Sequence, residues 1–206
     1  ITVPDLPDEH AVLRELLTVL QAYPKLVLDW RRDTARLNVV QEQIDIGVRI
    51  GHLADSRLIA RKIGETCEKI VMAPDLLRRL GKPEDFADLQ KNYPLAAVLN
   101  HNNGRADTWY INENLQFTPA KPHFVGSHIH NALQAALAGN AVSQQLDWMV
   151  APYLLNGELV ELFAEVPKIR WPVSIYRPQR VVTPMRVKVV FDLLAGILGK
   201  RFELPA

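Results

Sequence analysis

The pattern of apolar and polar residues predicts strands and helices that alternate from the first residue onward. Residues 1–4 are short, apolar and β-branched, as in a strand, and a polar turn follows them. Apolar residues then recur at helical spacing over residues 8–23, on a face wide enough to be buried on two sides. Residues 25–30 and 45–51 are predicted strands on either side of a helix at 34–43. This order favours a parallel sheet.

The remainder of the chain repeats this alternation. Residues 58–73 are predicted to form two extended stretches with a bend at Gly64, and a helix from Pro74 ends at Gly81. Ser127 is the expected N-cap of a helix at 128–139. For the last helix, Thr183 is the expected N-cap and Pro184 the first-turn proline. Shorter elements are predicted as helices at 83–90 and 149–156, a hairpin at 109–111 and 115–118, and strands at 95–99, 141–145, 159–165 and 172–176.

Composition excludes several classes of protein. With 206 residues and 48% hydrophobic content, the chain can bury a substantial core and is not a disordered tail. Its 24 Lys and Arg against 23 Asp and Glu leave no basic excess, so this part of the protein is expected to bind nucleic acid poorly. The single cysteine, Cys67, excludes an internal disulfide and suits a reducing cytoplasm. No apolar run approaches the ~20 residues that cross a bilayer, and the first residues lack a signal-peptide pattern.

Catalytic and metal-binding motifs are not evident either. The sequence has no nucleophile elbow, phosphate-binding loop, dinucleotide-binding glycine motif or zinc-protease helix, so we expect no enzyme activity, no catalytic residue and no cofactor. His128 and His130 are two apart on the predicted helix and point in different directions, and His123 lies outside it. No metal site is therefore expected.

Three stretches of residues 44–95 resemble the effector-binding domain of LysR-type transcriptional regulators. They are IDIGVRIG at 44–51, LADSRLIARKIGE at 53–65 and VMAPDLLRRLGKPEDFADL at 71–89. These stretches keep the family's spacing of Asp-x-x-x-Arg-x-Gly, Leu-x-Asp-Ser-x-Leu and Pro-x-x-Leu-x-x-x-Gly-x-Pro. Weaker similarity extends over nearly the whole chain.

The resemblance implies an α/β fold similar to type 2 periplasmic binding proteins. Two Rossmann-like lobes with mixed sheets would be joined by two crossing strands, near 71–73 and 172–175. Lobe I would combine residues 1–72 and 173–206, and lobe II would be residues 73–172. The DNA-binding winged helix-turn-helix of the family would be absent from this chain, and an effector in the cleft would change the lobes' relative orientation.

The resemblance also implies effector contacts at the turns after the strands. They would come from Asp5, Leu6, Thr34, Ala35, Arg49, Asn100, Ser127, His128, Asn140 and Ile175. For Thr34 and Ser127 a helix N-cap is the alternative role, and for Arg49 it is an ion pair on the sheet.

Two departures from the family bear on the effector. Leu6 stands where the family often has Ser or Thr, and the carboxylates of Asp5 and Asp8 flank it. Two carboxylates would repel an anion, so we expect a neutral or cationic effector. Asn140 follows Gly139 where the family has Gly-x-Gly, which adds a side-chain amide.

The family pairs two such domains antiparallel. Here the helices at 8–23 and 128–139 would meet, through Leu13, Leu17, Leu133 and Leu137. The sequence thus predicts a cytoplasmic small-molecule sensor that forms a homodimer, or a tetramer in the full-length regulator, and meets DNA only through the missing N-terminal domain. The alternative is a free-standing solute-binding protein of a transporter.

Overall fold

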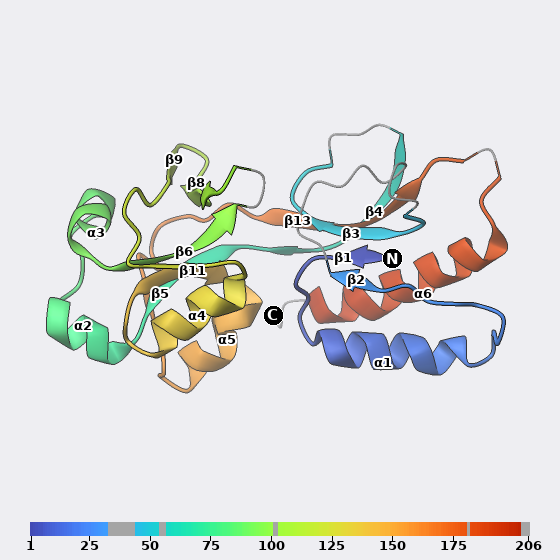
Figure 1. Ribbon diagram of the computed structural model, residues 1–206, viewed down its shortest axis with the longest axis horizontal. Coiled ribbons are helices and arrows are strands. Elements are labelled where there is room, and N and C mark those ends of the chain that lie inside the picture. Colours follow the sequence, from blue (N-terminus) through green and yellow to red (C-terminus); the bar gives the residue numbers. More distant parts are fainter. Residues whose placement is uncertain (33–43, 54–56, 101–102, 181, 203–206) are drawn as a thin grey trace. The chain divides into compact units, whose positions relative to one another are not determined.

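The fold is α/β, as predicted, and consists of two compact units that the chain builds in an interleaved order (Figure 1). Unit 1 is Ile1–Thr66 with Arg170–Ala206, and unit 2 is Cys67–Ile169. The chain therefore changes unit after Thr66 and again after Ile169, where the sequence predicted 72 and 172. The structure is a computed structural model, and it describes residues 1–32, 44–53, 57–100, 103–180 and 182–202.

Unit 1 is built on a mixed sheet whose described strands lie in the order β2, β1, β3, β13, β4. The strands β1, β2 and β3 are parallel, whereas β13 is antiparallel to both of its neighbours, β3 and β4. The bounds are β1 (Thr2–Val3), β2 (Arg31–Arg32), β3 (Gly47–Ile50), β4 (Leu58–Thr66) and β13 (Trp171–Pro178).

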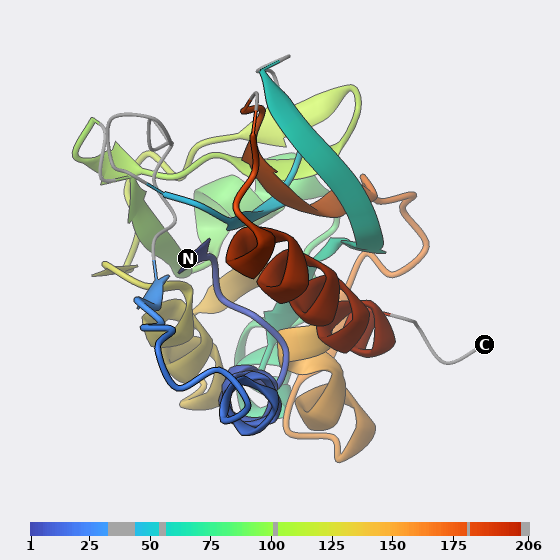
Figure 2. The ribbon, with the colours of Figure 1, turned by 90° about the vertical axis from the view of Figure 1, so that its right-hand side faces the viewer.

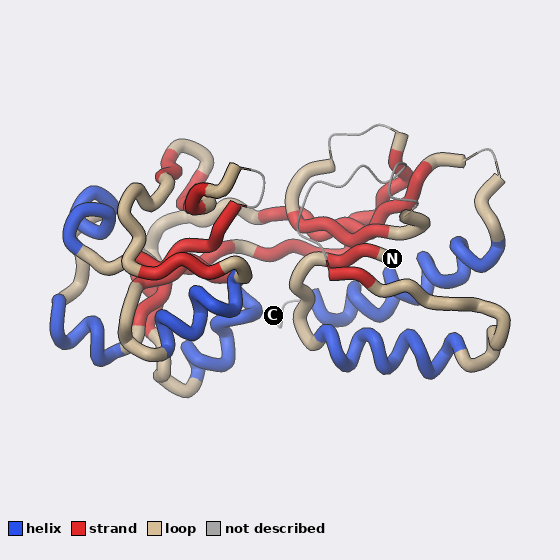
Figure 3. The backbone as a smooth tube through the Cα atoms, in the orientation of Figure 1, coloured by secondary structure: helices blue, strands red, loops and turns tan. Residues whose placement is uncertain are grey.

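Two helices cover one face of this sheet, α1 (Glu9–Leu20) and α6 (Met185–Phe202), and they also contact each other (Figures 2 and 3). Side chains alternate between the faces of a strand, so the paired residues Val48 and Ile175 share one face, and both are buried. Gly47 and its partner Tyr176 lie on the opposite face. In α6 the buried residues recur every three or four positions, as a helix packed on a sheet requires.

Unit 2 has a second mixed sheet, with described strands in the order β10, β6, β11, β5, β12 and with β7 paired to β6. Both faces of the sheet are covered, which explains why every residue of β11 is buried. The strands are β5 (Glu68–Met72), β6 (Leu95–Asn100), β7 (Arg105–Ala106), β10 (Phe124–Gly126), β11 (Val142–Leu146) and β12 (Val160–Leu162).

The larger core of unit 2 lies on the face that carries Ile70, Met72 and Leu95. It takes side chains from α2 (Pro74–Leu80), α3 (Phe86–Asn92) and the hairpin of β8 (Trp109–Asn112) and β9 (Leu115–Phe117). The other face packs Ala96 against alanines of α4 (Ile129–Leu137), and α5 (Asp147–Leu155) contacts β5 and β11.

The strand predicted at 25–30 is wrong. The ladder forms only at Arg31–Arg32, because β1 is two residues long and offers partners only to them. The preceding residues instead follow the edge of the sheet, with Leu26 and Leu28 lining a cavity. The helix predicted at 34–43 falls outside the described residues.

The bend predicted at Gly64 does not end the strand, because β4 runs through this residue to Thr66. The structure has a β-bulge there instead: Gly64 pairs with Val173 and Lys62 with Ser174, so Ile63 has no partner in the ladder. Glycine is needed there for a different reason: a Cβ atom on Gly64 would lie 2.3 Å from Cβ of Phe202, at the end of α6. The residue allows the last turn of α6 to approach the sheet.

At the starts of α3, α4 and α6 the capping residues differ from those that the sequence suggested. Ser127 does not cap α4, since the N-cap position is His128, whose amide donates to Oδ1 of Asn131 (3.1 Å). The carbonyl of Pro184 accepts the first hydrogen bonds of α6, so Pro184 precedes the helix, and Thr183 is not its cap. α3 begins at Phe86 because Oδ1 of Asp85 accepts from the amide of Asp88 (2.8 Å).

We expect glycine-to-alanine substitutions at two positions in unit 1 to have opposite effects on stability. A Cβ at Gly47 would lie 2.3 Å from Cζ of the buried Tyr176 ring, so Gly47→Ala should lower the free energy of unfolding by about 1–3 kcal/mol. A Cβ at Gly196 of α6 meets nothing within 4 Å, so Gly196→Ala should raise it by about 0.5–1 kcal/mol. Urea unfolding measures both; equal effects of the two substitutions would contradict this packing.

A half-buried ion triplet makes the stability of unit 2 depend on pH. Glu161 of β12 contacts Nζ of Lys69 at 2.6 Å and Nζ of Lys168 at 2.8 Å. Burial alone would raise the pKa of Glu161, but the hydrogen bonds from the two lysines outweigh burial and hold this pKa below its ordinary value of 4.5. A lowered pKa means that the folded state holds the proton less tightly than the unfolded state does. The carboxylate therefore stabilises the fold above about pH 4.5, and this contribution is lost as the pH falls through the folded-state pKa.

We accordingly expect Glu161→Gln to destabilise the chain at pH 7 and to reduce the loss of stability on acidification. Urea midpoints at about pH 7 and at an acidic pH below the ordinary pKa of 4.5 measure the effect. The exposed Glu165 provides the control, and Glu165→Gln should change neither midpoint appreciably. A Glu161→Gln variant with unchanged pH dependence would show that the triplet does not contribute.

Candidate functional site

In unit 1, the polar side chains of interest lie where the parallel strands end. The strands β1, β2 and β3 run in the same direction, so their carboxyl ends share one edge of the sheet. The chain also leaves and re-enters unit 1 at this edge, because the last residue of β4, Thr66, is paired with the first residue of β13, Trp171. Ligands of open α/β sheets bind at such an edge.

Asp5, two residues after β1, forms an ion pair with the guanidinium of Arg32 at the end of β2 (3.5 Å). Asp5 is only 6% exposed, which strengthens the interaction relative to a surface pair. Arg32 also forms an ion pair with Glu9 in the first turn of α1, and Nε1 of Trp30 donates to the same carboxylate (3.1 Å). Two carboxylates thus share the guanidinium of Arg32.

The network extends the sequence prediction, which included Asp5 but not Arg32, Glu9 or Trp30. Leu6 is buried, so its side chain is not available to a ligand at the surface. The side chain of Asp8 is exposed and makes no capping hydrogen bond.

The remaining predicted residues of unit 1 do not come together on one surface. Arg49 is half-buried on β3 and is paired with Ser174, so it shares the sheet face of Gly47. Ile175 has its side chain on the other face, fully buried against the helix layer. Thr34 and Ala35 lie outside the described residues.

An aromatic pair also occupies the carboxyl edge of unit 1. The rings of His52, which follows β3, and Trp171 are 6.5 Å apart and nearly perpendicular. Sequence patterns do not reveal this pair, because it depends on the register between the ends of two distant strands.

In unit 2, the carboxyl edge brings together residues from β6, β10 and β11, which are parallel. Asn100 ends β6, and its Nδ2 donates to Oδ1 of Asp107 (2.6 Å). Ser127 and His128 follow β10 and are exposed. Three predicted effector contacts therefore share one edge.

Buried polar groups support this edge from within. Gln145 of β11 is fully buried, and its Nε2 donates to the carbonyl of Ile129 (3.2 Å) and to Oγ of Ser143 (2.7 Å). Cys67 donates from Sγ to Oδ2 of Asp147 (3.4 Å), at the start of α5. These bonds fix the first residues of α4 and α5 to the sheet.

Asn140 does not belong to this edge. It precedes β11, at the amino end of the strand, and is exposed there. The adjacent carbonyl of Gly139 accepts a hydrogen bond from Nη2 of Arg79 (2.7 Å). This bond holds the turn before β11 at the edge opposite to the carboxyl ends of the strands.

The predicted dimer residues have different accessibilities. In α1 the leucine Leu17 is 46% exposed and Leu13 is half-buried, so both retain surface for a partner. In α4, Leu133 is 3% exposed and is buried within unit 2, while Leu137 is half-buried. Leu133 therefore offers almost no surface to a partner.

Within the ranges that the structure describes, no group of three His, Cys, Asp or Glu side chains is placed to hold a metal ion. None of the described helices is long and apolar enough to cross a membrane.

Comparison with known proteins agrees with this arrangement of strands and loops. Among curated relatives, the HTH-type transcriptional regulator CrgA of Neisseria meningitidis (strain 8013) is 26% identical over 183 residues, covering 87% of this chain and 60% of CrgA. The transcriptional activator TtdR of Escherichia coli (strain K12) is 22% identical over 192 residues, covering 91% of this chain and 60% of TtdR. The chain thus spans about 60% of the length of these relatives.

Solved structures show the same fold. The regulatory domain of CrgA from Neisseria meningitidis superposes with a TM-score of 0.73 and 20% identity, over 96% of this chain and 98% of that domain. The regulatory domain of AphB from Vibrio vulnificus superposes with a TM-score of 0.77 and 19% identity, over 95% of this chain and 96% of that domain.

The family itself follows from the sequence as a whole. The model of the LysR substrate binding domain matches residues 1–198. Since the relatives compared are transcriptional regulators, the resemblance seen in residues 44–95 is confirmed, and the transporter alternative is not supported. The chain belongs to the LysR substrate binding domain family.

Proposed function

We propose that this chain is the effector-sensing domain of a LysR-type transcriptional regulator and that it binds a small molecule without transforming it. The observation that carries the proposal is the family match over residues 1–198, on a chain that covers about 60% of relatives named as HTH-type regulators. DNA would be contacted by a helix-turn-helix segment of the full-length protein, and the balance of 24 basic and 23 acidic residues agrees with that division. Such a regulator would work in the cytoplasm.

The effector would contact the loops at the carboxyl edges of the two sheets. In unit 1 these loops carry Asp5, Glu9 and Arg32, and in unit 2 they carry Asn100, with Ser127 and His128 as exposed donors and acceptors. The two carboxylates beside Arg32 are hydrogen-bond acceptors and repel an anion, which favours a neutral ligand with hydrogen-bond donors, or a cation. Arg49 remains a candidate contact, and Asn140 would require a ligand that reaches the opposite edge.

The domain would also pair with a second copy of itself. The exposed part of Leu17 and the half-buried Leu13 form a stripe on the outer side of α1, whose inner side is already occupied by Val12, Leu16 and Leu20. On α4 the half-buried Leu137 would take part, whereas Leu133 would only support the helix. A dimer, or a tetramer of the full-length regulator, would use these helices.

The effector class can be tested by a thermal-shift screen of amines, sugars, amides and carboxylates. A ligand at 100 times its dissociation constant adds about 2.7 kcal/mol of stability, which gives a clear shift. We expect the effective compound to be neutral or cationic, and its shift to be reduced in Glu9→Gln but unchanged in Glu113→Gln, an exposed acid in the β8–β9 turn. A response confined to carboxylates and dependent on Arg32 would contradict the proposed class.

The dimer can be tested with two leucines that are equally exposed. Leu17 of α1 and Leu80 of α2 are both 46% exposed, but only Leu17 lies on the proposed interface. Leu17→Glu should raise the dimer dissociation constant at least about thirtyfold, as loss of a central contact does, whereas Leu80→Glu should leave it unchanged. Sedimentation velocity measures both constants. A wild-type chain that stays monomeric, or equal effects of the two substitutions, would count against the arrangement.

A further inference from the structure

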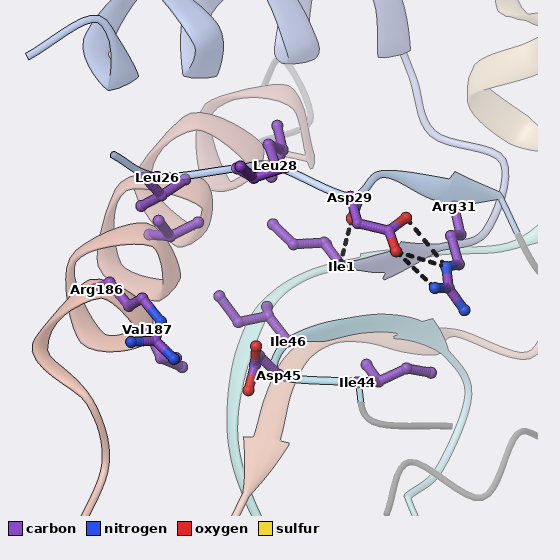
Figure 4. A pocket seen from close by; sticks show the side chains of 12 residues that line it. Ile1, Leu26, Leu28, Asp29, Arg31, Ile44, Asp45, Ile46, Arg186 and Val187 are labelled. Atoms are coloured by element: carbon purple, nitrogen blue, oxygen red, sulfur yellow. Dashed lines mark hydrogen bonds and ion pairs between the residues drawn. The ribbon is translucent and has the colours of Figure 1, made fainter. Parts of the chain in front are cut away.

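A cavity of about 290 Å³ lies in unit 1 at the amino ends of the strands (Figure 4). Its walls come from three segments: Ile1 and residues 44–46, which precede β1 and β3; the edge segment 26–31; and the first turns of α6. The strands β1 and β3 end at the other edge of the sheet, where Asp5 lies. The cavity is therefore separate from the loops of the proposed effector site.

The cavity wall is about half apolar, and its apolar part comes mainly from buried side chains. Ile44, Ile46, Val187 and Val190 are each less than 7% exposed, and they contribute side chains from both the sheet and α6. Leu26 and Leu28 add a further apolar wall from the edge segment (Figure 4). The volume is near the lower end of small-molecule sites, which are typically ~300–1,000 Å³ and mostly apolar.

The cations of the lining are Arg31, Arg186 and the α-ammonium group of Ile1, which donates a hydrogen bond to the carbonyl of Asp29 (2.6 Å). The two carboxylates of the lining are already paired: Asp29 with Arg31 at 2.6 Å, and Asp45 with Arg180 at 3.0 Å. Arg186, in the first turn of α6, forms no ion pair with any residue that the structure describes, and Figure 4 shows it across the cavity from the Asp29–Arg31 pair. Its guanidinium is exposed and can form two parallel hydrogen bonds to a carboxylate.

We propose that this cavity is a second small-molecule site, which binds a small monocarboxylate with its apolar body between the sheet and α6 and its carboxylate on Arg186. This cavity is distinct from the effector site of the proposed function. The effector site lies at the carboxyl edges of the sheets and favours a neutral or cationic ligand, whereas the cavity lies at the amino edge and favours an anion. A neutral molecule of the same shape would keep the apolar contacts and lose the charge-assisted hydrogen bonds. An amine would keep the apolar contacts and meet an unfavourable charge.

The test uses the 206-residue chain labelled with ¹⁵N, titrated with benzoate and with hexanoate up to tens of millimolar. Benzamide serves as the neutral counterpart and benzylamine as the cationic one. Both carboxylates should shift the amide signals of residues 26–29 and 187–190 and leave those of residues 5–9 in place. Benzamide should bind about tenfold more weakly, because a hydrogen bond to a charged group is worth about a factor of ten or more.

Matched variants assign the binding to the cavity. Arg186→Gln should raise the benzoate dissociation constant about tenfold, whereas Lys188→Gln, which removes the same charge from an exposed position two residues along α6, should change it less than about twofold. Leu28→Trp should fill the cavity and abolish binding while leaving the spectrum folded. Arg32→Gln, at the opposite edge, should have no effect.

Several outcomes would overturn the proposal. They are the absence of localised shifts with either carboxylate, equal dissociation constants in Arg186→Gln and Lys188→Gln, preferential binding of benzylamine, or loss of benzoate binding in Arg32→Gln. The proposed function is tested independently, since an effector that responds to Glu9→Gln would stand even if the cavity bound nothing.

Discussion

The pairing of β13 between β3 and β4 is the interaction on which the rest of the structure depends. This strand comes from the end of the sequence, yet it forms the ladders that join β3 to β4 and buries Val173 and Ile175 beneath the helices. Without it, β4 has no described strand partner in the sheet. Unit 1 therefore needs both ends of the chain, and unit 2 is inserted as a continuous segment. The same pairing sets Trp171 beside Thr66, so both passages between the units occur at the edge where the parallel strands end. Polar loops at that edge are held by a rigid scaffold, which is the condition for a binding site.

The fold could be predicted from the sequence where local patterns and packing agree. The apolar run of β6 and the helical periodicity of α6 gave elements close to those observed, because their burial matches their period. Local patterns failed where a distant partner decides the structure. Residues 25–30 have strand-like composition, but the two-residue β1 gives them no ladder. Gly64 is typical of a bend, but the structure places only a β-bulge beside it, and the approach of Phe202 explains why glycine is needed in this strand.

The site was only partly predictable for the same reason. Asp5 was expected from its position after the first strand, but Arg32 and Glu9 join it only through the parallel pairing of β1 with β2 and the start of α1. Leu133 fits the apolar stripe of a helix, yet the stripe that packs inward and the one that faces a partner cannot be distinguished by spacing alone. The family resemblance supplied what periodicity could not: the order in which the chain returns to its first sheet.

Amide hydrogen exchange on a chain that ends at Ile169 tests the role of the returning strand most directly. If β13 holds unit 1 together, amides of β3 and β4 should exchange as in an unfolded peptide, while those of β5, β6 and β11 keep their protection because unit 2 has a core of its own. Protection retained in β3 and β4 without residues 170–206 would contradict the account.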